Sequence, residues 1–242
     1  MRKAVSWHDN NKPQTINHQL DNPVWAALSS KQVHFNRGND LLKYFPSDVA
    51  PFMALENWNE KDLEILEQQL PAARTFSFVS TKNISLPDSL ETVISIPLYQ
   101  MHCPVLQPVS VPENLIMPLG DEHIPLMLEL TAMTKPGPFY QRTIDFGNYL
   151  GIFQDDQLVS MAGDRMKVNG YTEVSAICTH PDHTGKKYAS YLTTRAAERI
   201  IQEGDIPFLH VRTDNLRAIE VYKKMGFEVR ADINFAIFKK RE

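Results

Sequence analysis

Residues 171–227 decide the fold, and they read YTEVSAICTH PDHTGKKYAS YLTTRAAERI IQEGDIPFLH VRTDNLRAIE VYKKMGF. Residues 171–178 predict a strand. From 188 onwards apolar residues recur at helical spacing and predict a long amphipathic helix. After a break at Gly204, residues 208–212 predict a second strand, and a short helix follows. The order strand, loop, helix, strand, helix is therefore the centre of the predicted fold.

The loop between the first strand and the long helix has the composition of an anion site. Pro181 precedes it and Gly185 lies inside it, so the backbone can turn sharply and leave N–H groups unpaired at a helix N-terminus. Those donors and the positive end of the helix dipole bind anions, and Lys186 and Lys187 add positive charge. We therefore expect a phosphate-binding loop, although glycine turns of this kind are common in α/β proteins.

Together with the second helix, this loop resembles the GNAT superfamily of acyl-CoA-dependent N-acetyltransferases. The commonest form of the family's loop is P-x-x-R-G-x-G-x-A. Gly185 and Ala189 match it, whereas Thr184 and Lys187 stand where the family has arginine and its second glycine. Residues 215–227 match the family's N-x-x-A-x-x-x-Y-x-x-x-G-F segment at every defined position. The resemblance covers roughly residues 114–240, about half the chain.

The resemblance implies a set of functional residues, with acetyl-CoA as the acyl donor and no metal. Tyr222 would protonate the leaving thiolate, and Glu173 would remove the amine's proton through water, with His180 as the alternative base. The main-chain N–H groups of Ile177, Cys178 and Thr179 would polarise the carbonyl of the acetyl-CoA thioester. The residues implied in binding CoA are Ile177, Cys178 and Thr179 on the strand, Thr184, Gly185, Lys186, Lys187, Tyr188, Ala189 and Ser190 at the loop, and Asn215.

The acceptor site is implied less specifically. Phe139 and Arg142 follow a helix predicted at 125–133 and would form one wall of this site by resemblance. A structural salt bridge is the alternative role for Arg142, and a solvent-facing strand position is the alternative for Glu173. Small amines, amino acids, aminoglycosides and protein N-termini all stay open as acceptors, because specificity in such folds depends on loops.

Length and composition describe an ordinary globular protein. The chain has 242 residues, 43% hydrophobic and 22% charged, with a formal net charge of −4. This length accommodates two α/β domains. No basic face is visible, which argues against nucleic acid as a partner. Residues 1–14 lack an apolar signal region and no window reaches membrane-spanning length, so we expect no membrane partner and a cytoplasmic location. Cys103 and Cys178 are predicted to be free thiols. A homodimer is expected only because symmetric pairs are common among proteins.

Prolines at 104, 108 and 112 indicate a joint between two parts. Residues 1–111 are predicted to form an N-terminal α/β subdomain, and residues 112–242 a GNAT acetyltransferase domain. One hypothesis is that the first part is a degenerate copy of the second. The elements expected around the central stretch are a helix at 60–70 capped by Asn59, strands at 75–80, 92–96 and 114–118, and a meander at 146–153, 158–166 and 171–178 with a turn at Asn169-Gly170. A closing strand is expected at 233–238.

The predicted fold class is α/β in the mixed α+β sense, with a central mixed sheet flanked by helices. The predicted function is N-acetyl transfer from acetyl-CoA to an amine acceptor by direct attack in a ternary complex. Two alternatives stay open. One is a catalytically silent acyl-CoA-binding or regulatory protein, which Thr184 and Lys187 favour. The other is a protein-interaction module whose N-terminal half does the binding.

Overall fold

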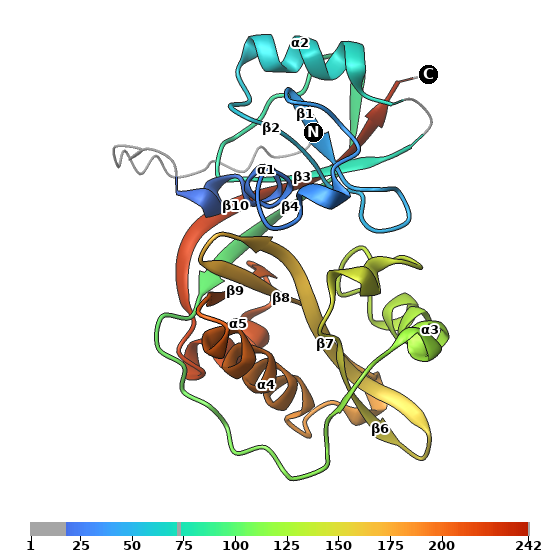
Figure 1. Cartoon of the computed structure of the whole chain (residues 1–242), viewed down its shortest axis with the longest axis vertical. Helices are drawn as coiled ribbons and strands as arrows, with labels where there is room; N and C mark the ends of the chain where they lie inside the picture. Colours follow the sequence, from blue (N-terminus) through green and yellow to red (C-terminus); the bar gives the residue numbers. More distant parts are fainter. Residues whose placement is uncertain (1–17, 72–73, 242) are drawn as a thin grey trace, which may run out of the picture.

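The structure is a computed structural model that describes residues 18–71 and 74–241, so the predicted polar N-terminus at 1–14 lies outside it. Figure 1 shows an upper and a lower lobe. The helices are α1 (Pro23–Leu28), α2 (Glu60–Gln69), α3 (Ile124–Thr134), α4 (Tyr188–Gln202) and α5 (Leu216–Lys224), with 3-10 helices η1 (Gln19–Asp21), η2 (Val33–Phe35), η3 (Asp121–His123), η4 (Thr143–Phe146) and η5 (Pro181–His183). The strands are β1 (Leu42–Tyr44), β2 (Met53–Leu55), β3 (Phe76–Ser80), β4 (Leu90–His102), β5 (Met117–Pro118), β6 (Leu150–Gln154), β7 (Gln157–Val168), β8 (Tyr171–Thr179), β9 (Ile206–Arg212) and β10 (Glu228–Lys240).

An eight-stranded sheet organises the described part of the chain, in the order β3-β10-β4-β9-β8-β7-β6-β5, while β1 and β2 form a separate two-stranded sheet. Strands β6, β7 and β8 pair antiparallel as the predicted meander. Strand β9 instead runs parallel to β8, after the crossover through α4. The predicted fold class, a central mixed sheet flanked by helices, is confirmed.

Most predicted elements form, with changes at their ends. The side chain of Asn59 caps α2 by accepting from the Asp62 amide at 2.9 Å. The strand predicted at 92–96 is far longer as β4, because its pairing with β10 continues from Leu90 to His102. The strand predicted at 114–118 shortens to β5, which pairs only two residues with β6. Pro118 has no N–H to extend that ladder.

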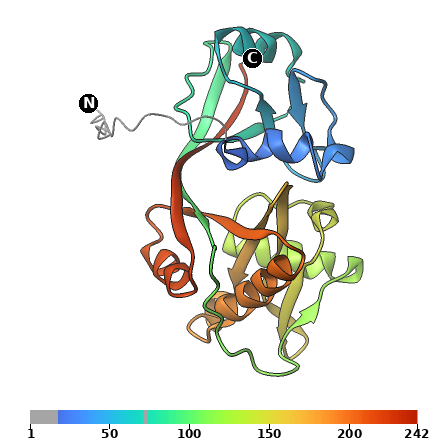
Figure 2. The same cartoon turned by 60° about the vertical axis from the view of Figure 1, so that its left-hand side comes forward.

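Strands from the two parts of the sequence alternate within the large sheet. Strand β4 precedes the predicted boundary at 111/112, yet it lies between β9 and β10, which both follow it. Strand β10 in turn pairs with β3 on its other side. Figure 2 shows β4 and β10 running side by side from the lower lobe to the upper one. The sheet is therefore continuous across the boundary; the domain division and the degenerate-copy hypothesis stay predictions.

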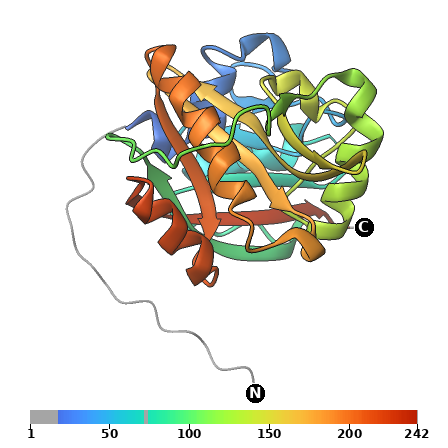
Figure 3. The same cartoon turned by 90° about the horizontal axis from the view of Figure 1, so that it is seen from below.

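Helices α4 and α3 cover opposite faces of the strands β6–β8 (Figure 3). Leu192, Ala196 and Ile200 of α4 pack on the strands in one apolar cluster. Met127 and Leu130 of α3 pack in a second cluster. This arrangement follows from the alternation of strand side chains, which sends successive residues to opposite faces. Both the beginning of α4 and the loop after α3 are thereby held against β8.

The upper lobe shares a core with the lower one. Val24, Ala27 and Leu28 of α1 pack in one cluster with Phe208 of β9 and with residues of β7 and β10. Each of the three α1 side chains and Phe208 is fully buried. Because apolar burial is the main stabilising contribution to folding, the N-terminal elements support the strands on which the predicted site lies.

Candidate active site

The candidate site lies where β8 separates from β9. The two strands pair only from Tyr171 to Glu173 on β8 and from Ile206 to Phe208 on β9. Both strands continue, β8 to Thr179 and β9 to Arg212. A register shift against β7 marks a bulge near Ala176, whose φ of +51° lies in the left-handed region. Bulges bend a strand locally, so β8 turns away from β9 and leaves a gap in the sheet.

Main-chain groups of β8 face this gap. The carbonyl of Cys178 accepts from the Ser160 hydroxyl on β7 at 2.7 Å, and the His180 amide donates to Val159 on β7 at 2.7 Å. In a strand, alternate residues point their N–H and C=O groups to opposite edges. Ile177 and Thr179 therefore direct theirs toward the gap. The thiol of Cys178 is buried, and burial raises its pKa to about 11, which makes it a poor nucleophile.

The predicted phosphate loop lies at the start of α4. Gly185 has a φ of +82°, and no atom lies within 4 Å of the position a Cβ would take. Lys187 has a φ of +63° and precedes the first helical residue, with no side chain capping the helix. In the described part of the chain, no acceptor pairs with the amides of Gly185, Lys186 or Lys187. These amides and those of the first turn of α4, at Tyr188, Ala189 and Ser190, form a cluster of free donors.

Lys187 takes the backbone conformation that the family's second glycine would supply. The left-handed region costs a non-glycine residue about 1–2 kcal/mol, so the loop keeps its shape at a cost in stability. Thr184 also contributes to the shape, because its hydroxyl donates to the Pro181 carbonyl at 3.1 Å. The side chains that depart from the family's pattern are thus compatible with the loop's backbone.

Helix α5 holds Tyr222 beside the gap. Its N-terminus is capped by Asn215, whose side chain accepts from the Ala218 amide at 3.2 Å. Its C-terminus ends at Gly226, where φ is +92° and a Cβ would lie 2.0 Å from the Val105 carbonyl oxygen. Tyr222 packs in one cluster with residues of β4 and β9, and Ile177 of β8 packs against that cluster. Burial raises the pKa of Tyr222 well above its usual value, so the phenol stays protonated and can donate.

Glu173 is fully buried rather than solvent-facing. Its carboxylate accepts from Arg165 Nε at 2.9 Å and Nη2 at 2.5 Å, and from His210 Nδ1 at 2.7 Å. Burial alone would raise the pKa of Glu173, but Arg165 and then His210 outweigh burial and lower that pKa to about 2. The carboxylate is therefore ionised and weakly basic. Its role as general base stays a prediction.

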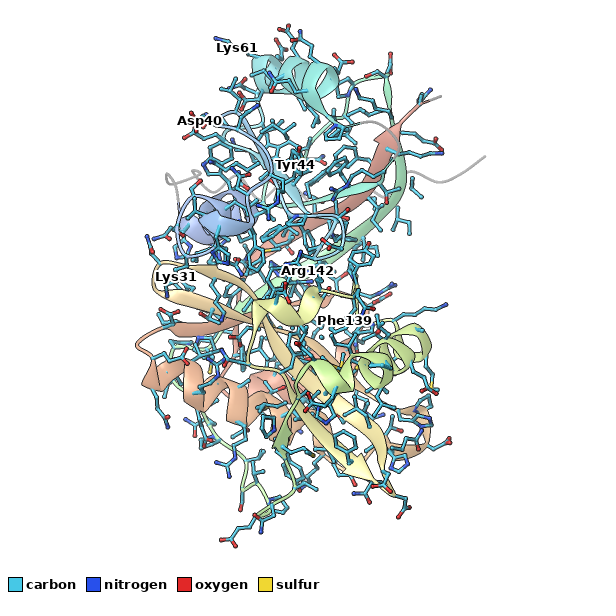
Figure 4. All side chains as sticks on the ribbon, turned by 45° about the vertical axis from the view of Figure 1, so that its right-hand side comes forward. Lys31, Asp40, Tyr44, Lys61, Phe139 and Arg142 are labelled. Carbon is cyan, nitrogen blue, oxygen red and sulfur yellow. The ribbon has the colours of Figure 1, made fainter. Side chains whose placement is uncertain are left out.

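The two predicted acceptor residues differ in their surroundings. Phe139 lines a hollow between the loop after α3 and β8. Arg142 instead pairs with Asp48 at 3.3 Å and with Asp145 at 2.6 Å, as the salt-bridge alternative predicts. Figure 4 shows Arg142 at the junction of the two lobes and Phe139 next to it on the lower lobe. Contact of either residue with an acceptor stays a prediction.

Sequence reasoning missed Arg165 and His210, which bind Glu173, and Gln100, which binds His210. Gln100 on β4 donates to His210 Nε2 at 3.0 Å and accepts from Arg230 Nε. A signal for Arg165 was present, since a charged pair, Asp164-Arg165, interrupts the mostly apolar run at 158–166. Buried charges in strands are usually paired, but the sequence does not tell with which residues.

The comparisons with known proteins bear on the family and the fold. The model of the FR47-like protein family matches residues 149–236. A protein from Novosphingobium aromaticivorans DSM 12444, whose crystal structure is assigned to the GNAT family of acetyltransferases, is 27% identical with a TM-score of 0.86, over 93% of this chain and 100% of that one. A GCN5-related N-acetyltransferase from Kribbella flavida is 15% identical with a TM-score of 0.60, over 90% and 94% of the two chains. A Drosophila protein is 15% identical with a TM-score of 0.63, over 84% and 76%. No curated protein matches the chain.

At 15% identity the last two structures show the fold alone, whereas the first covers both lobes of this chain. The matched family model and the shared fold support the GNAT superfamily for the C-terminal half of the protein, as its two motifs predict. Its fold is one that supports acyl transfer. Within the described ranges, no helix is long and apolar enough to cross a membrane. The described residues also include no group of three or more His, Cys, Asp or Glu placed to hold a metal ion.

We expect Lys187→Gly to be more stable than Lys186→Gly. Both substitutions remove one lysine and add one glycine to the loop, but only position 187 has a positive φ. The first substitution removes the cost of about 1–2 kcal/mol that a non-glycine residue incurs in the left-handed conformation. The second only adds backbone entropy to the unfolded chain, which lowers stability. Thermal unfolding of both variants measures the difference. Equal midpoints would contradict the conformation assigned to Lys187.

We expect the pairing of Glu173 to make the protein lose stability in acid. The folded pKa of about 2 lies below the unfolded value of about 4.3. The stabilisation is therefore complete above about pH 4.3 and is lost as the pH falls through that interval toward 2. Glu173→Gln should flatten this acid limb and lower the free energy of unfolding at neutral pH by about 3–5 kcal/mol.

Urea unfolding across this pH range tests the expectation. The matched control is Glu198→Gln, which removes an exposed partner of Arg195 and should cost less than about 1 kcal/mol. The same acid limb in Glu173→Gln and in the unmodified protein would assign the acid sensitivity to other groups.

Proposed function

We propose that the protein transfers an acetyl group from acetyl-CoA to an amine. The observation that carries this proposal is the gap between β8 and β9, which has a cluster of free amides at the start of α4 on one side and Tyr222 of α5 on the other. A nucleotide diphosphate matches the first feature, and an acyl thioester matches the second. Few other ligands need a phosphate-binding cluster of amides and a proton donor at the same opening in a sheet.

Acetyl-CoA would lie along this opening. Its diphosphate would accept hydrogen bonds from the amides of 185–190, with Lys186 and Lys187 adding charge. Its pantetheine arm would pair with the main-chain groups of Ile177 and Thr179 in the manner of an added strand. The thioester carbonyl would then lie near the bulge at Ala176, where an amide can stabilise the developing oxyanion.

The reaction is a direct attack with no enzyme-bound acyl group. The neutral amine attacks the thioester carbon, the carbon–sulfur bond breaks, and the thiolate of CoA leaves. The attacking nitrogen loses one proton to solvent as the amide forms, and Tyr222 would protonate the thiolate and recover its own proton from solvent. An alkylamine with a pKa of roughly 10.4 must first lose a proton. Glu173 stays the predicted acceptor of this proton, although its low pKa makes it a weak base.

Calorimetric titration tests the binding half of the proposal. We expect saturable binding of acetyl-CoA and of CoA, and none of ATP, because ATP lacks the pantetheine arm. Release of free CoA thiol in the presence of a panel of amines, followed by a thiol reagent, tests the chemical half. Binding without thiol release for any amine would favour a silent acyl-CoA-binding protein. No binding at all would overturn the proposal and leave the interaction module as the better explanation.

We expect Tyr222→Phe to lower kcat by about 100-fold or more, while the Kd for acetyl-CoA changes little. The phenylalanine keeps the packing of α5 and removes only the proton donor, whose contribution appears in the transition state. Steady-state kinetics and calorimetry measure the two quantities. Tyr171→Phe is the matched control, because that hydroxyl bonds His18 at 3.1 Å at the other end of β8. An unchanged kcat in Tyr222→Phe would remove Tyr222 from the proton-donor role.

A further inference from the structure

A small hollow lies next to the β8 bulge. It lies between the loop after α3 and β8, and its lining includes Pro136, Gly137, Pro138, Phe139, Arg165 and Ala176. Ala176 is the bulge residue and immediately precedes Ile177, whose main-chain groups face the gap. The hollow therefore adjoins the position proposed for the thioester. Among its described lining residues, Arg165 is the one that carries a charge.

The guanidinium of Arg165 is held by two partners, Glu173 and Phe52. Its Nε and Nη2 both donate to the buried Glu173 carboxylate. Its face lies 5.0 Å from the centre of the Phe52 ring, so the N-terminal lobe also limits its movement. Planar guanidinium groups held by two parallel bonds to a carboxylate have a defined orientation. The direction of the remaining nitrogen, Nη1, is set by these contacts.

Nη1 is directed at the hollow. It lies 3.9 Å from the point that a Cβ on Gly137 would occupy, and Gly137 forms part of the hollow's wall. Within residues 18–71 and 74–241, no acceptor bonds to this nitrogen, although Nε and Nη2 are both used. Two N–H donors of a cation thus face a site with apolar walls of proline and aromatic side chains.

The acidic groups nearby are already engaged. The Glu173 oxygens accept from Arg165, His210 and the Met166 amide. Asp164, the preceding residue on β7, pairs with Arg199 and Lys167. Neither carboxylate is free to serve Nη1, so an acceptor for its donors has to come from solvent or from a ligand.

The hydrogen bonds around His210 assign the position of its ring hydrogen. Gln100 Nε2 has two hydrogens, and they go to the Leu20 carbonyl at 2.9 Å and to His210 Nε2 at 3.0 Å. His210 Nε2 is then an acceptor, so the ring's single proton is on Nδ1 and is donated to Glu173. Glu173 balances Arg165 alone. What Nη1 offers a ligand is therefore directional hydrogen bonding from a charged donor in a partly dry site, which is strong and selective for anions.

We propose that Nη1 of Arg165 binds a carboxylate of the acceptor, and that the acceptor is a free amino acid. This inference rests on the proposed acetyl transfer. A carboxylate supplies the acceptor oxygens that Nη1 lacks, and the amine of the same small molecule would reach the adjoining thioester. The ring of Phe139 and the neighbouring prolines would contact its side chain. The products would be an N-acetyl amino acid and CoA.

The test compares amino acids with their carboxamides as acceptors, using thiol release from acetyl-CoA. Each pair has the same side chain and differs in the group that Nη1 would bind. The carboxamide has the less basic amine and so the larger neutral fraction, and protonation of the amine alone would favour it. We expect kcat/KM to be higher for the acid of at least one pair by about 10- to 100-fold, the range of a hydrogen bond to a charged group.

The variant Arg165→Lys tests whether Arg165 causes the preference for amino acids over their carboxamides. Lysine keeps a positive charge for Glu173 but has a single nitrogen, so the second set of donors is lost. We expect KM for the preferred amino acid to rise by about 10- to 100-fold more than KM for its carboxamide, while the Kd for acetyl-CoA changes little. Arg195→Lys, at an exposed ion pair on α4, is the matched control and should leave the preference intact.

The outcomes separate this inference from the proposed function. Absence of acetyl-CoA binding, or of thiol release with every amine, would overturn the proposed function and this inference with it. Turnover of carboxamides and simple amines at least as fast as of every amino acid would overturn this inference alone. An equal loss for acid and amide in Arg165→Lys would give Arg165 a structural role only. If Arg165→Lys does not fold, the comparison of amino acids with their carboxamides in the unmodified protein decides whether the acceptor carboxylate is recognised.

Discussion

The buried carboxylate of Glu173 links three neighbouring strands at the place where two of them part. Arg165 of β7 and His210 of β9 both donate to it. The network continues from His210 through Gln100 of β4 to Arg230 of β10 and the Leu20 carbonyl. Beyond Glu173 the ladder between β8 and β9 ends, and no further main-chain bonds hold those strands together. Side-chain bonds in a site of low dielectric replace them, which lets the sheet open without separating.

The opening matters because it combines two kinds of unpaired main-chain groups. The free edge of β8 offers N–H and C=O groups in the extended arrangement, and the first turn of α4 offers amides with the helix dipole behind them. Helix α4 is anchored by Leu192, Ala196 and Ile200 on the strands, so those amides have fixed positions. A ligand that binds there gains several directional bonds without the protein having to rearrange, and preorganisation of this kind favours affinity and catalysis.

The two parts of the chain contribute to this region together. Strand β4 fills the place beside β9, and α1 packs on the face below Phe208. Phe52 contacts Arg165, while Asp48 and the Val49 carbonyl bind Arg142 and the Thr143 hydroxyl. The wall of the hollow that contains Phe139 therefore depends on the N-terminal loop at 46–52. Such shared packing makes the N-terminal part a support for the site, whatever its evolutionary origin.

The sequence by itself determined the local elements and the two motifs, because these depend on neighbours along the chain. Asn59 and Asn215 cap the helices that follow them, and Gly226 has the positive φ that ends α5. Only the tertiary structure decided how β4 and β10 pair, that Glu173 is buried rather than solvent-facing, and that Arg165 meets both Glu173 and the hollow. A strand's period places a residue on a face but does not tell which strands will flank it. Contacts between residues more than a hundred positions apart, such as Gln100 with His210, arise from the packing of the whole chain, so no local pattern contains them.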